Sequence, residues 1–207
     1  MITYEEKLNR DTAWALLEGS MHFEEKSAVH ETLRNLTQSL NELGVDYAVA
    51  GGMAMFLHGF RRFTEDVDVL VTQESLAAIH AALEGRGYVK PFTASKNLRD
   101  TRTGVKIDFL ISGQFPGDGK PGPIAFPHPA NVSKESDGMR VVELTPLIEL
   151  KLASGRAPHR GKDLDDVQSL IQALSLPRGL AERLDPSVRD AYLLKWEHAQ
   201  RAAADDY

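Results

Sequence analysis

Apolar residues in the first 44 positions recur at helical spacing. A stripe at intervals of three and four predicts an amphipathic helix that ends at Gly44. A shorter first helix is expected over 4–18, with Gly19 and Ser20 as a break. We therefore expect residues 1–44 to form a helical segment packed on the core. The members of the stripe are Val29, Leu33, Leu36, Leu40 and Leu43.

The middle of the chain changes to short apolar runs separated by turns. Runs at 46–50, 66–71 and 105–111 predict strands, whereas the Gly- and Pro-rich stretch 114–129 predicts irregular structure. Strands mixed with helices predict an α+β (mixed α/β) fold, a small mixed sheet flanked by helices, with a core over 45–144 and a helical region over 145–207. The remaining expected elements are helices at 53–58, 74–87, 145–154, 164–174, 178–184 and 186–203, strands at 88–89 and 139–144, and a polar hairpin at 93–104.

Two carboxylates stand at the start of one predicted strand. Because strand side chains alternate between faces, Asp66 and Asp68 share one face while Val67 and Val69 take the other. Like charges this close resist desolvation unless a cation neutralises them. Mg²⁺ prefers oxygen ligands, usually one or two carboxylates together with substrate phosphates. The pair therefore predicts a metal site that faces a phosphate-bearing substrate.

A third carboxylate lies in the strand at 105–111. Asp108 falls on the face opposite Val105, Ile107 and Phe109, in the middle of a strand where Asp is unfavourable. If this strand pairs beside 66–71, three carboxylates converge on one face. That number is enough to hold two metal ions about 3.5–4 Å apart for an in-line displacement at phosphorus.

A glycine pair, Gly51 and Gly52, connects the strand at 46–50 to the short helix. The first N–H groups of such a helix are unpaired and attract anions, although a Gly-Gly pair can also be only a turn. His58 at the end of this helix is either a ligand or base or, more commonly for such a position, structural.

Taken in order, GGMAMFLHGFRRFTEDVDVLV, VKIDFLI and LIELKLASGRAPHRGKDLDDVQSLI resemble the nucleotidyltransferase superfamily of the polymerase-β type, in particular a bacterial branch that contains abortive-infection toxins and their relatives. The resemblance spans about residues 45–175. It departs from the pattern at Gly52, where many members carry serine. It implies a metal site at Asp66, Asp68 and Asp108, with Mg²⁺ or Mn²⁺ as cofactor and an NTP as substrate. It adds the following site residues: Gly51, Gly52, Arg62, Thr64, Lys151, Lys162, Asp163 and Asp166.

For several of these residues the sequence also permits a plain structural role. Arg62 could be solvated at the surface, and Lys151 could extend its ammonium to solvent from an apolar helix. Asp163 and Asp166 are three residues apart in a first helical turn, where acidic residues are favourable in any protein.

Composition narrows the functional classes. The chain has 207 residues, no cysteine and a net charge of −6, which excludes disulfides and thiolate chemistry and argues against broad non-specific binding of nucleic acid. No apolar stretch reaches the length of a membrane span, and the first residues lack the apolar core of a signal peptide, so a cytoplasmic location without membrane attachment is expected.

Together with the three carboxylates, the resemblance implies a metal-dependent nucleotidyltransferase that moves an NMP from an NTP to an acceptor hydroxyl. The toxin-like resemblance suggests tRNA or protein as the acceptor and an antitoxin protein as a partner. The alternatives are transfer to a small molecule such as an aminoglycoside, and an inactive nucleotide- or metal-binding module. The base of the nucleotide and the oligomeric state are left open.

Overall fold

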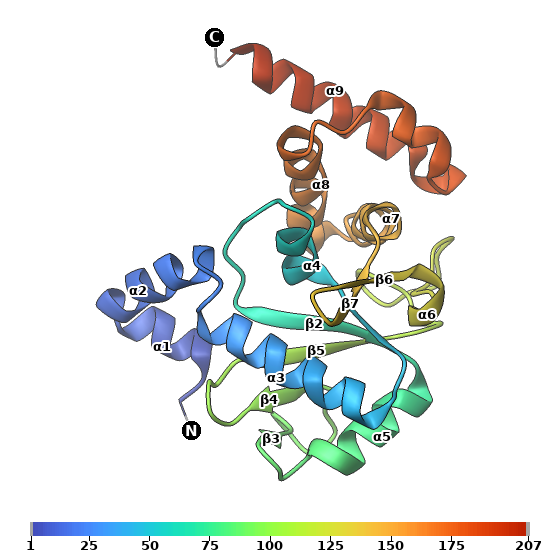
Figure 1. Cartoon of the computed structure of the whole chain (residues 1–207). Coiled ribbons are helices and arrows are strands. Elements are labelled where there is room, and N and C mark those ends of the chain that lie inside the picture. Colours follow the sequence, from blue (N-terminus) through green and yellow to red (C-terminus); the bar gives the residue numbers. More distant parts are fainter. Residues whose placement is uncertain (1, 206–207) are drawn as a thin grey trace.

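The computed structural model of the chain describes residues 2–205, with side chains through residue 202. Its strands are β1 (Tyr47–Val49), β2 (Asp66–Val71), β3 (Tyr88–Val89), β4 (Leu98–Asp100), β5 (Lys106–Ile111), β6 (Ser133–Ser136) and β7 (Met139–Val142). They form one seven-stranded sheet in the order β3-β4-β5-β2-β1-β7-β6 (Figure 1). β2 runs parallel to β5 and antiparallel to β1, so the sheet is mixed. The expected fold class is confirmed.

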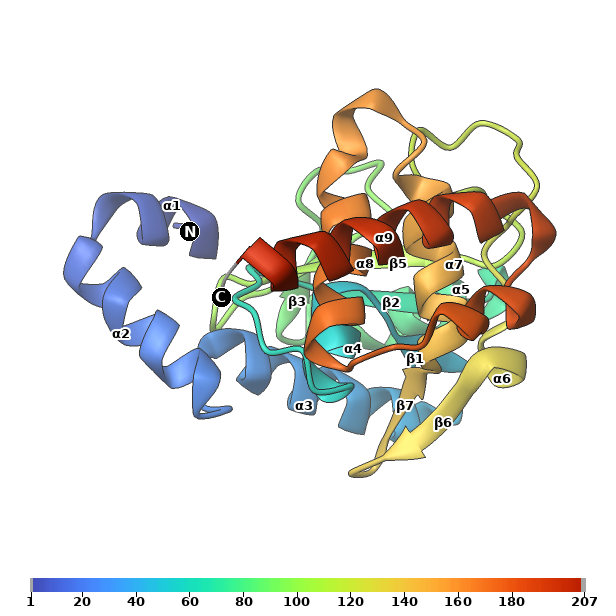
Figure 2. The ribbon, with the colours of Figure 1, turned by 90° about the horizontal axis from the view of Figure 1, so that it is seen from above.

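Helices cover both faces of this sheet. The buried side chains of Val67, Val69 and Val71 share the face covered by α3 and α5, and Asp66 and Asp68 lie on the face covered by α4 and α7 (Figures 1 and 2). The helices named here and below are α3 (Ala28–Leu43), α4 (Gly51–Leu57), α5 (Gln73–Leu83), α6 (Pro129–Val132), α7 (Leu144–Ser154), α8 (Gly161–Ala173) and α9 (Arg189–Asp205).

The first helical segment differs from the expectation for 4–18. It is two helices, α1 (Tyr4–Arg10) and α2 (Thr12–Phe23), which lie to one side of the sheet in both views (Figures 1 and 2). The break is at Asp11, whose carboxylate accepts a hydrogen bond from the N–H of Trp14 at 2.9 Å and so begins the second helix. The predicted break at Gly19 and Ser20 was wrong, because both residues lie inside α2.

The amphipathic stripe of α3 is confirmed for four of its five members. Val29, Leu33, Leu36 and Leu40 are buried against the sheet, whereas Leu43 in the last turn is exposed. The helix ends as predicted at Gly44, which has a φ of +64°. The division of the chain at residues 44 and 144 stays a prediction.

Several boundaries and three short elements were also missed. The expected helix 74–87 ends at Leu83, and β4 lies inside the segment expected as a polar hairpin. α6 and β6 follow the irregular loop, which itself has no helix or strand through residue 128, as expected. The C-terminal region contains three 3₁₀ turns: η1 (Pro158–Arg160) before α8, η2 (Arg178–Arg183) in place of the expected helix 178–184, and η3 (Pro186–Val188) at the start of the expected helix 186–203.

The last helix, α9, packs on α8 at the far side of the molecule from α3 (Figure 1). Tyr192 is fully buried, and its hydroxyl donates to the carbonyl of Pro177 at 3.0 Å. Trp196 donates its indole N–H to the carbonyl of Leu176 at 3.0 Å. The hydrophobic face of α9 is therefore used within the chain. None of the described helices combines the length and apolarity needed to span a bilayer, and a cytoplasmic location stays a prediction.

Two buried histidines connect α2 and α3 to the segment before β2. Nε2 of His22 lies 3.0 Å from the carbonyl oxygen of Arg62, which can only accept, so this nitrogen carries the proton. Nδ1 of His22 then accepts from the Ser27 hydroxyl at 3.2 Å, and that hydroxyl accepts from Nδ1 of His30 at 3.0 Å. Nε2 of His30 is buried and has no hydrogen-bond partner in the described part of the chain. Burial lowers the pKa of both histidines, that of His30 to about 4.

These histidines make stability depend on pH. An unfolded histidine takes up a proton near pH 6.5, whereas folded His30 stays neutral down to about pH 4, so the unfolded chain binds more protons in this window. We expect the free energy of unfolding to fall by up to about 3 kcal/mol from this residue as pH drops through the window. Urea denaturation at several pH values measures this decrease in the free energy of unfolding.

The matched variant is His30→Asn, whose amide N–H can still donate to Ser27 but does not titrate. It should lose this part of the pH dependence, whereas His159→Asn, at an exposed histidine, should keep the profile of the unchanged protein. Equal profiles for all three proteins would contradict the assignment.

Candidate active site

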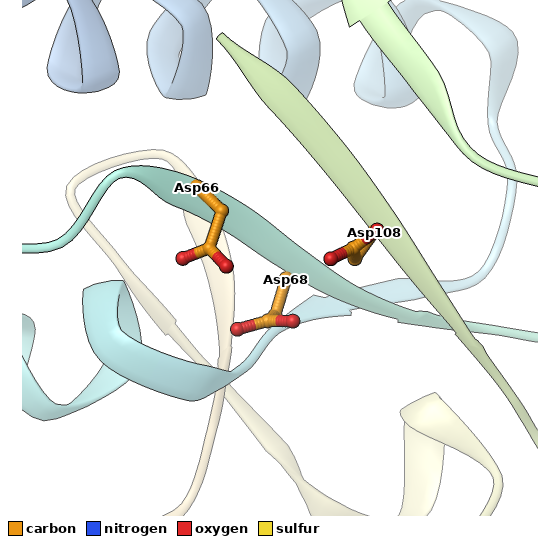
Figure 3. A group of neighbouring side chains, drawn as sticks. All are labelled: Asp66, Asp68 and Asp108. Carbon is orange, nitrogen blue, oxygen red and sulfur yellow. The ribbon is translucent and has the colours of Figure 1, made fainter. Parts of the chain in front are cut away.

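The three predicted carboxylates meet at one place on the sheet. β2 and β5 are parallel neighbours in a register that sets Asp68 directly opposite Asp108. Asp66 lies two residues earlier on the same face of β2, and one carboxylate oxygen of each residue lies within 4.8 Å of the others (Figure 3). The predicted strand pairing and the convergence of the three side chains are therefore present.

The glycine pair leaves room for two of the site's side chains. A Cβ on Gly51 would lie 1.8 Å from Oδ2 of Asp68, and its φ of +57° is also unfavourable for other residues. A Cβ on Gly52 would lie 2.7 Å from Oγ1 of Thr64. Thr64 in turn donates its hydroxyl to Oδ1 of Asp66 at 2.8 Å. The first turn of α4 is thus in direct contact with the carboxylate strand.

Asp68 is the carboxylate with the least support. Among the described residues no group donates a hydrogen bond to its side chain, and desolvation together with the charges of Asp66 and Asp108 raises its pKa to about 7, against the opposing effect of Lys151 and Arg160. A cation at this position would remove the repulsion. An all-carboxylate donor set of this kind fits a hard divalent cation such as Mg²⁺ or Mn²⁺.

Asp108 is held by two neighbours that the sequence did not identify as site residues. Nζ of Lys106 lies 2.8 Å from Oδ2, and the side-chain amide of Asn97 donates to Oδ1. The amide oxygen of Asn97 accepts from the N–H of Phe109 at 3.0 Å, which fixes its orientation. The strand pattern in the sequence already put Lys106 on the same face as Asp108, but no pattern indicated that Asn97 belongs to the site.

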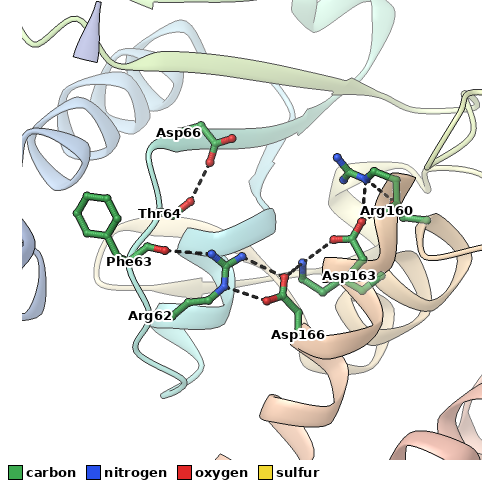
Figure 4. Close-up of polar contacts among 9 residues, drawn as sticks. Arg62, Phe63, Thr64, Asp66, Arg160, Asp163 and Asp166 are labelled. Atoms are coloured by element: carbon green, nitrogen blue, oxygen red, sulfur yellow. Dashed lines mark hydrogen bonds and ion pairs between the residues drawn. The ribbon is translucent and has the colours of Figure 1, made fainter. Parts of the chain in front are cut away.

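The wall opposite the carboxylates is a buried ion network (Figure 4). Nζ of Lys151 lies 3.1 Å from Oδ1 of Asp163 and 2.6 Å from Oδ2 of Asp166. Arg62 also binds Asp166 through two nitrogens, each 3.0 Å from an oxygen. Burial alone would raise the pKa of Asp163, but Lys151 first, then Ser154 and Arg160, hold that pKa below its usual range.

This network brings together four residues that the family resemblance named, and gives them contacts with one another. Arg62 meets Asp166 and not the three carboxylates, and Lys151 meets two carboxylates of α8. The aspartates are therefore not solvated caps of α8. With Arg160, which donates from Nε to Asp163 at 2.9 Å, the network contains three cations and two carboxylates, so it carries one positive charge toward the cleft.

The cleft between these walls has a volume of about 670 Å³. Its rim includes Lys162, an exposed residue at the start of α8, and the irregular loop from Gln114 to Phe126. Gly117 of that loop packs against the end of α7, where an added Cβ would lie 3.0 Å from the carbonyl oxygen of Ser154. His58 is not part of the cleft lining; its Nε2 lies 2.8 Å from the carbonyl oxygen of Val142, a structural contact.

The close packing of Asp68 against Gly51 can be tested by substitution. Gly51→Ala should displace the Asp68 carboxylate or the start of α4, and lower the free energy of unfolding by about 1–3 kcal/mol through overpacking and an unfavourable φ. Gly19→Ala, inside α2 with open space at its Cβ, should instead be neutral or stabilising. Chemical denaturation measures both, and a Gly51→Ala protein as stable as the parent would contradict the packing described.

Divalent cations should stabilise the folded protein through Asp68. At 100 times its dissociation constant, Mg²⁺ or Mn²⁺ should raise the free energy of unfolding by about 2.7 kcal/mol, seen as a higher Tm. Asp68→Asn should remove most of this increase. It should also raise the Tm without metal, because one of three repelling charges is gone.

Asp165→Asn is the matched control, since its carboxylate is exposed on α8 and, among the described residues, forms an ion pair with Lys195 alone. Its response to the cations should equal that of the unchanged protein. A cation effect that survives in Asp68→Asn would contradict the site.

Comparison with known proteins identifies the family of this chain. No curated protein sequence matches the chain significantly. A crystal structure of ANT(2'')-Ia in complex with adenylyl-2''-tobramycin is 16% identical, with a TM-score of 0.51 over 80% of this chain and 97% of that one. A solution structure of the antibiotic-resistance factor ANT(2'')-Ia is 16% identical, with a TM-score of 0.52 over 82% and 96%. At 16% identity, these two structures show that the chain shares their fold.

A provisionally assigned nucleotidyltransferase from Thermotoga maritima is 19% identical over 65% of this chain and 89% of that one, with a TM-score of 0.48. The family model described as aminoglycoside-2''-adenylyltransferase matches residues 32–167, which include β1, β2, β5, the glycine turn and the ion network. The match covers well over half of the chain. The chain therefore belongs to the aminoglycoside-2''-adenylyltransferase family of nucleotidyltransferases.

Proposed function

We propose that this protein transfers a nucleoside monophosphate from an NTP, ATP in the first instance, to a hydroxyl of a small cationic acceptor of the aminoglycoside type, with Mg²⁺ or Mn²⁺ as cofactor. The observation that carries the proposal is the meeting of Asp66, Asp68 and Asp108 in one cleft beside the glycine turn. The nucleotide and the class of acceptor come from the family to which the chain belongs.

The three carboxylates take different parts in this proposal. Asp66 and Asp68 would hold a divalent ion, and burial together with the neighbouring carboxylates raises the pKa of Asp68 in spite of Lys151 and Arg160. A bound ion supplies positive charge that ties the triphosphate to β2 and offsets the charge on the departing pyrophosphate. Asp108 would orient the acceptor hydroxyl and take its proton as the oxygen attacks the α-phosphorus and the bond to pyrophosphate breaks.

The positive wall of the cleft would hold the phosphates. Lys151 uses two directions of its ammonium on Asp163 and Asp166, which leaves one N–H for a phosphate oxygen. Arg160 and Lys162 add charge at the start of α8, and Gly51 and Gly52, which also line the cleft, would offer their backbone N–H groups. Arg62 and Thr64 would act at one remove, by positioning Asp166 and Asp66.

A small acceptor agrees with the size and charge of the molecule. A cleft of about 670 Å³ is within the range of small-molecule sites, and a net charge of −6 favours a cationic acceptor over a polyanion. The solved ANT(2'')-Ia complex contains an adenylylated aminoglycoside, a product of this chemical class. The RNA or protein acceptor and the antitoxin partner, which the toxin-like resemblance suggested, stay predictions without a supporting contact.

Transfer of label distinguishes these acceptors. The protein is incubated with α-³²P-ATP, Mg²⁺ and, in separate reactions, a panel of aminoglycosides, total tRNA or cell protein. We expect label on an aminoglycoside and pyrophosphate release, and a decrease of about 10²- to 10⁴-fold for Asp108→Asn, because the proton acceptor is lost.

Asp165→Asn again serves as the control and should transfer at the unchanged rate, since its carboxylate is exposed and lies outside the cleft lining. Label on tRNA or on protein alone would replace the acceptor class proposed here. Nucleotide binding without transfer to any acceptor would support the inactive binding module in its place.

A further inference from the structure

Lys106 binds Asp108 on the side where a second metal ion would bind if the three carboxylates held two ions. It stands two residues before Asp108 on the same face of β5, opposite Asp66 in the register with β2, and its Nζ lies 2.8 Å from Oδ2 of Asp108. We propose that Lys106 takes the place of a second divalent ion, so that the site works with one ion on Asp66 and Asp68. This inference rests on the proposed function.

The three carboxylates differ in how they are supported. Both oxygens of Asp108 have a donor, from Lys106 and from Asn97, and one of these donors is a cation. Asp66 has only the neutral hydroxyl of Thr64, and Asp68 has no donor among the described residues. The uncompensated negative charge therefore lies on β2, which is where a divalent ion gains most from binding.

Asn97 makes the support of Asp108 rigid. Its amide oxygen accepts from the N–H of Phe109, so its amide nitrogen must face Asp108. Its own N–H donates to the hydroxyl of Ser95, and that hydroxyl donates back to the carbonyl of Asn97. The Asp108 carboxylate is thus held in place by an amide on one oxygen and an ammonium on the other. A carboxylate held in this way suits the role of proton acceptor, whereas a metal ligand would have to rotate away from these donors.

A second ion would have to compete with the ammonium. Lys106 and Asp108 together carry no net charge, so a divalent ion there gains little attraction and must displace the lysine. The ammonium itself is a positioning group: it acts through Asp108, whose carboxylate receives the proton of the acceptor hydroxyl. The 36% exposure of the Lys106 side chain shows that replacing it need not disturb the core.

Native mass spectrometry of the intact chain counts the ions directly. The probe is Mn²⁺ with an ATP analogue that has a methylene group between the α- and β-phosphorus atoms, so no transfer takes place. We expect one Mn²⁺ per complex for the unchanged protein and for Lys106→Arg, which keeps the positive charge. Lys106→Met keeps the side-chain length but not the charge, and should shift the complex to two Mn²⁺.

Lys134→Met, at an exposed lysine on β6, is the matched control and should hold one ion. Two ions in the unchanged protein, two in Lys106→Arg, or one in Lys106→Met would each overturn the inference. Complexes with nucleotide but without any Mn²⁺ would overturn the proposed function as well, which distinguishes the two failures. A melting curve by circular dichroism confirms that each variant is folded before the ions are counted.

Discussion

Repulsion between three carboxylates on two adjacent parallel strands is the constraint on which the rest of the site depends. The register of β2 and β5 fixes Asp68 opposite Asp108, so the charges cannot separate without breaking the sheet. Each carboxylate has a different set of donors among the described residues: Asp66 accepts from a hydroxyl, Asp108 from an ammonium and an amide, and Asp68 from no group. Burial, and then the charges of Asp66 and Asp108, raise the pKa of Asp68, so a bound cation would stabilise the site most at this carboxylate.

The ion network on the opposite wall of the cleft has an excess of positive charge instead, and its cations must stay in place while no substrate is bound. Two aspartates of α8 hold Lys151, Arg62 and Arg160 in fixed positions. Buried ion pairs add little net stability, since desolvation offsets most of their attraction. Their value here is geometric: cations already positioned do not need to be ordered when a triphosphate enters. The hydrogen bond from His22 to the carbonyl of Arg62 extends the same support to the N-terminal helices.

The sequence predicted the centre of the site better than its surroundings, for a physical reason. Strict alternation in β2 and β5 fixes which face each aspartate takes, and a one-residue slip would expose the valines, so the convergence followed from local pattern. The partners of Lys151 depend on how α7 and α8 cross, which no local pattern encodes. Asn97 lies in a polar segment without periodicity. The break at Asp11 was missed because its capping hydrogen bond competes with an otherwise continuous helical pattern.

The glycine pair shows how a departure from a family pattern can be compensated within the fold. Many members of the superfamily carry serine at the position of Gly52, and the sequence alone implies that a hydroxyl is missing there. The structure places the hydroxyl of Thr64 in that space, 2.7 Å from where a Cβ of residue 52 would lie. A side chain at residue 52 would therefore require Thr64 to shift from the position it has here. The hydroxyl beside the turn is retained, but it comes from the strand side and bonds Asp66, which joins the phosphate turn to the carboxylates in one packed unit.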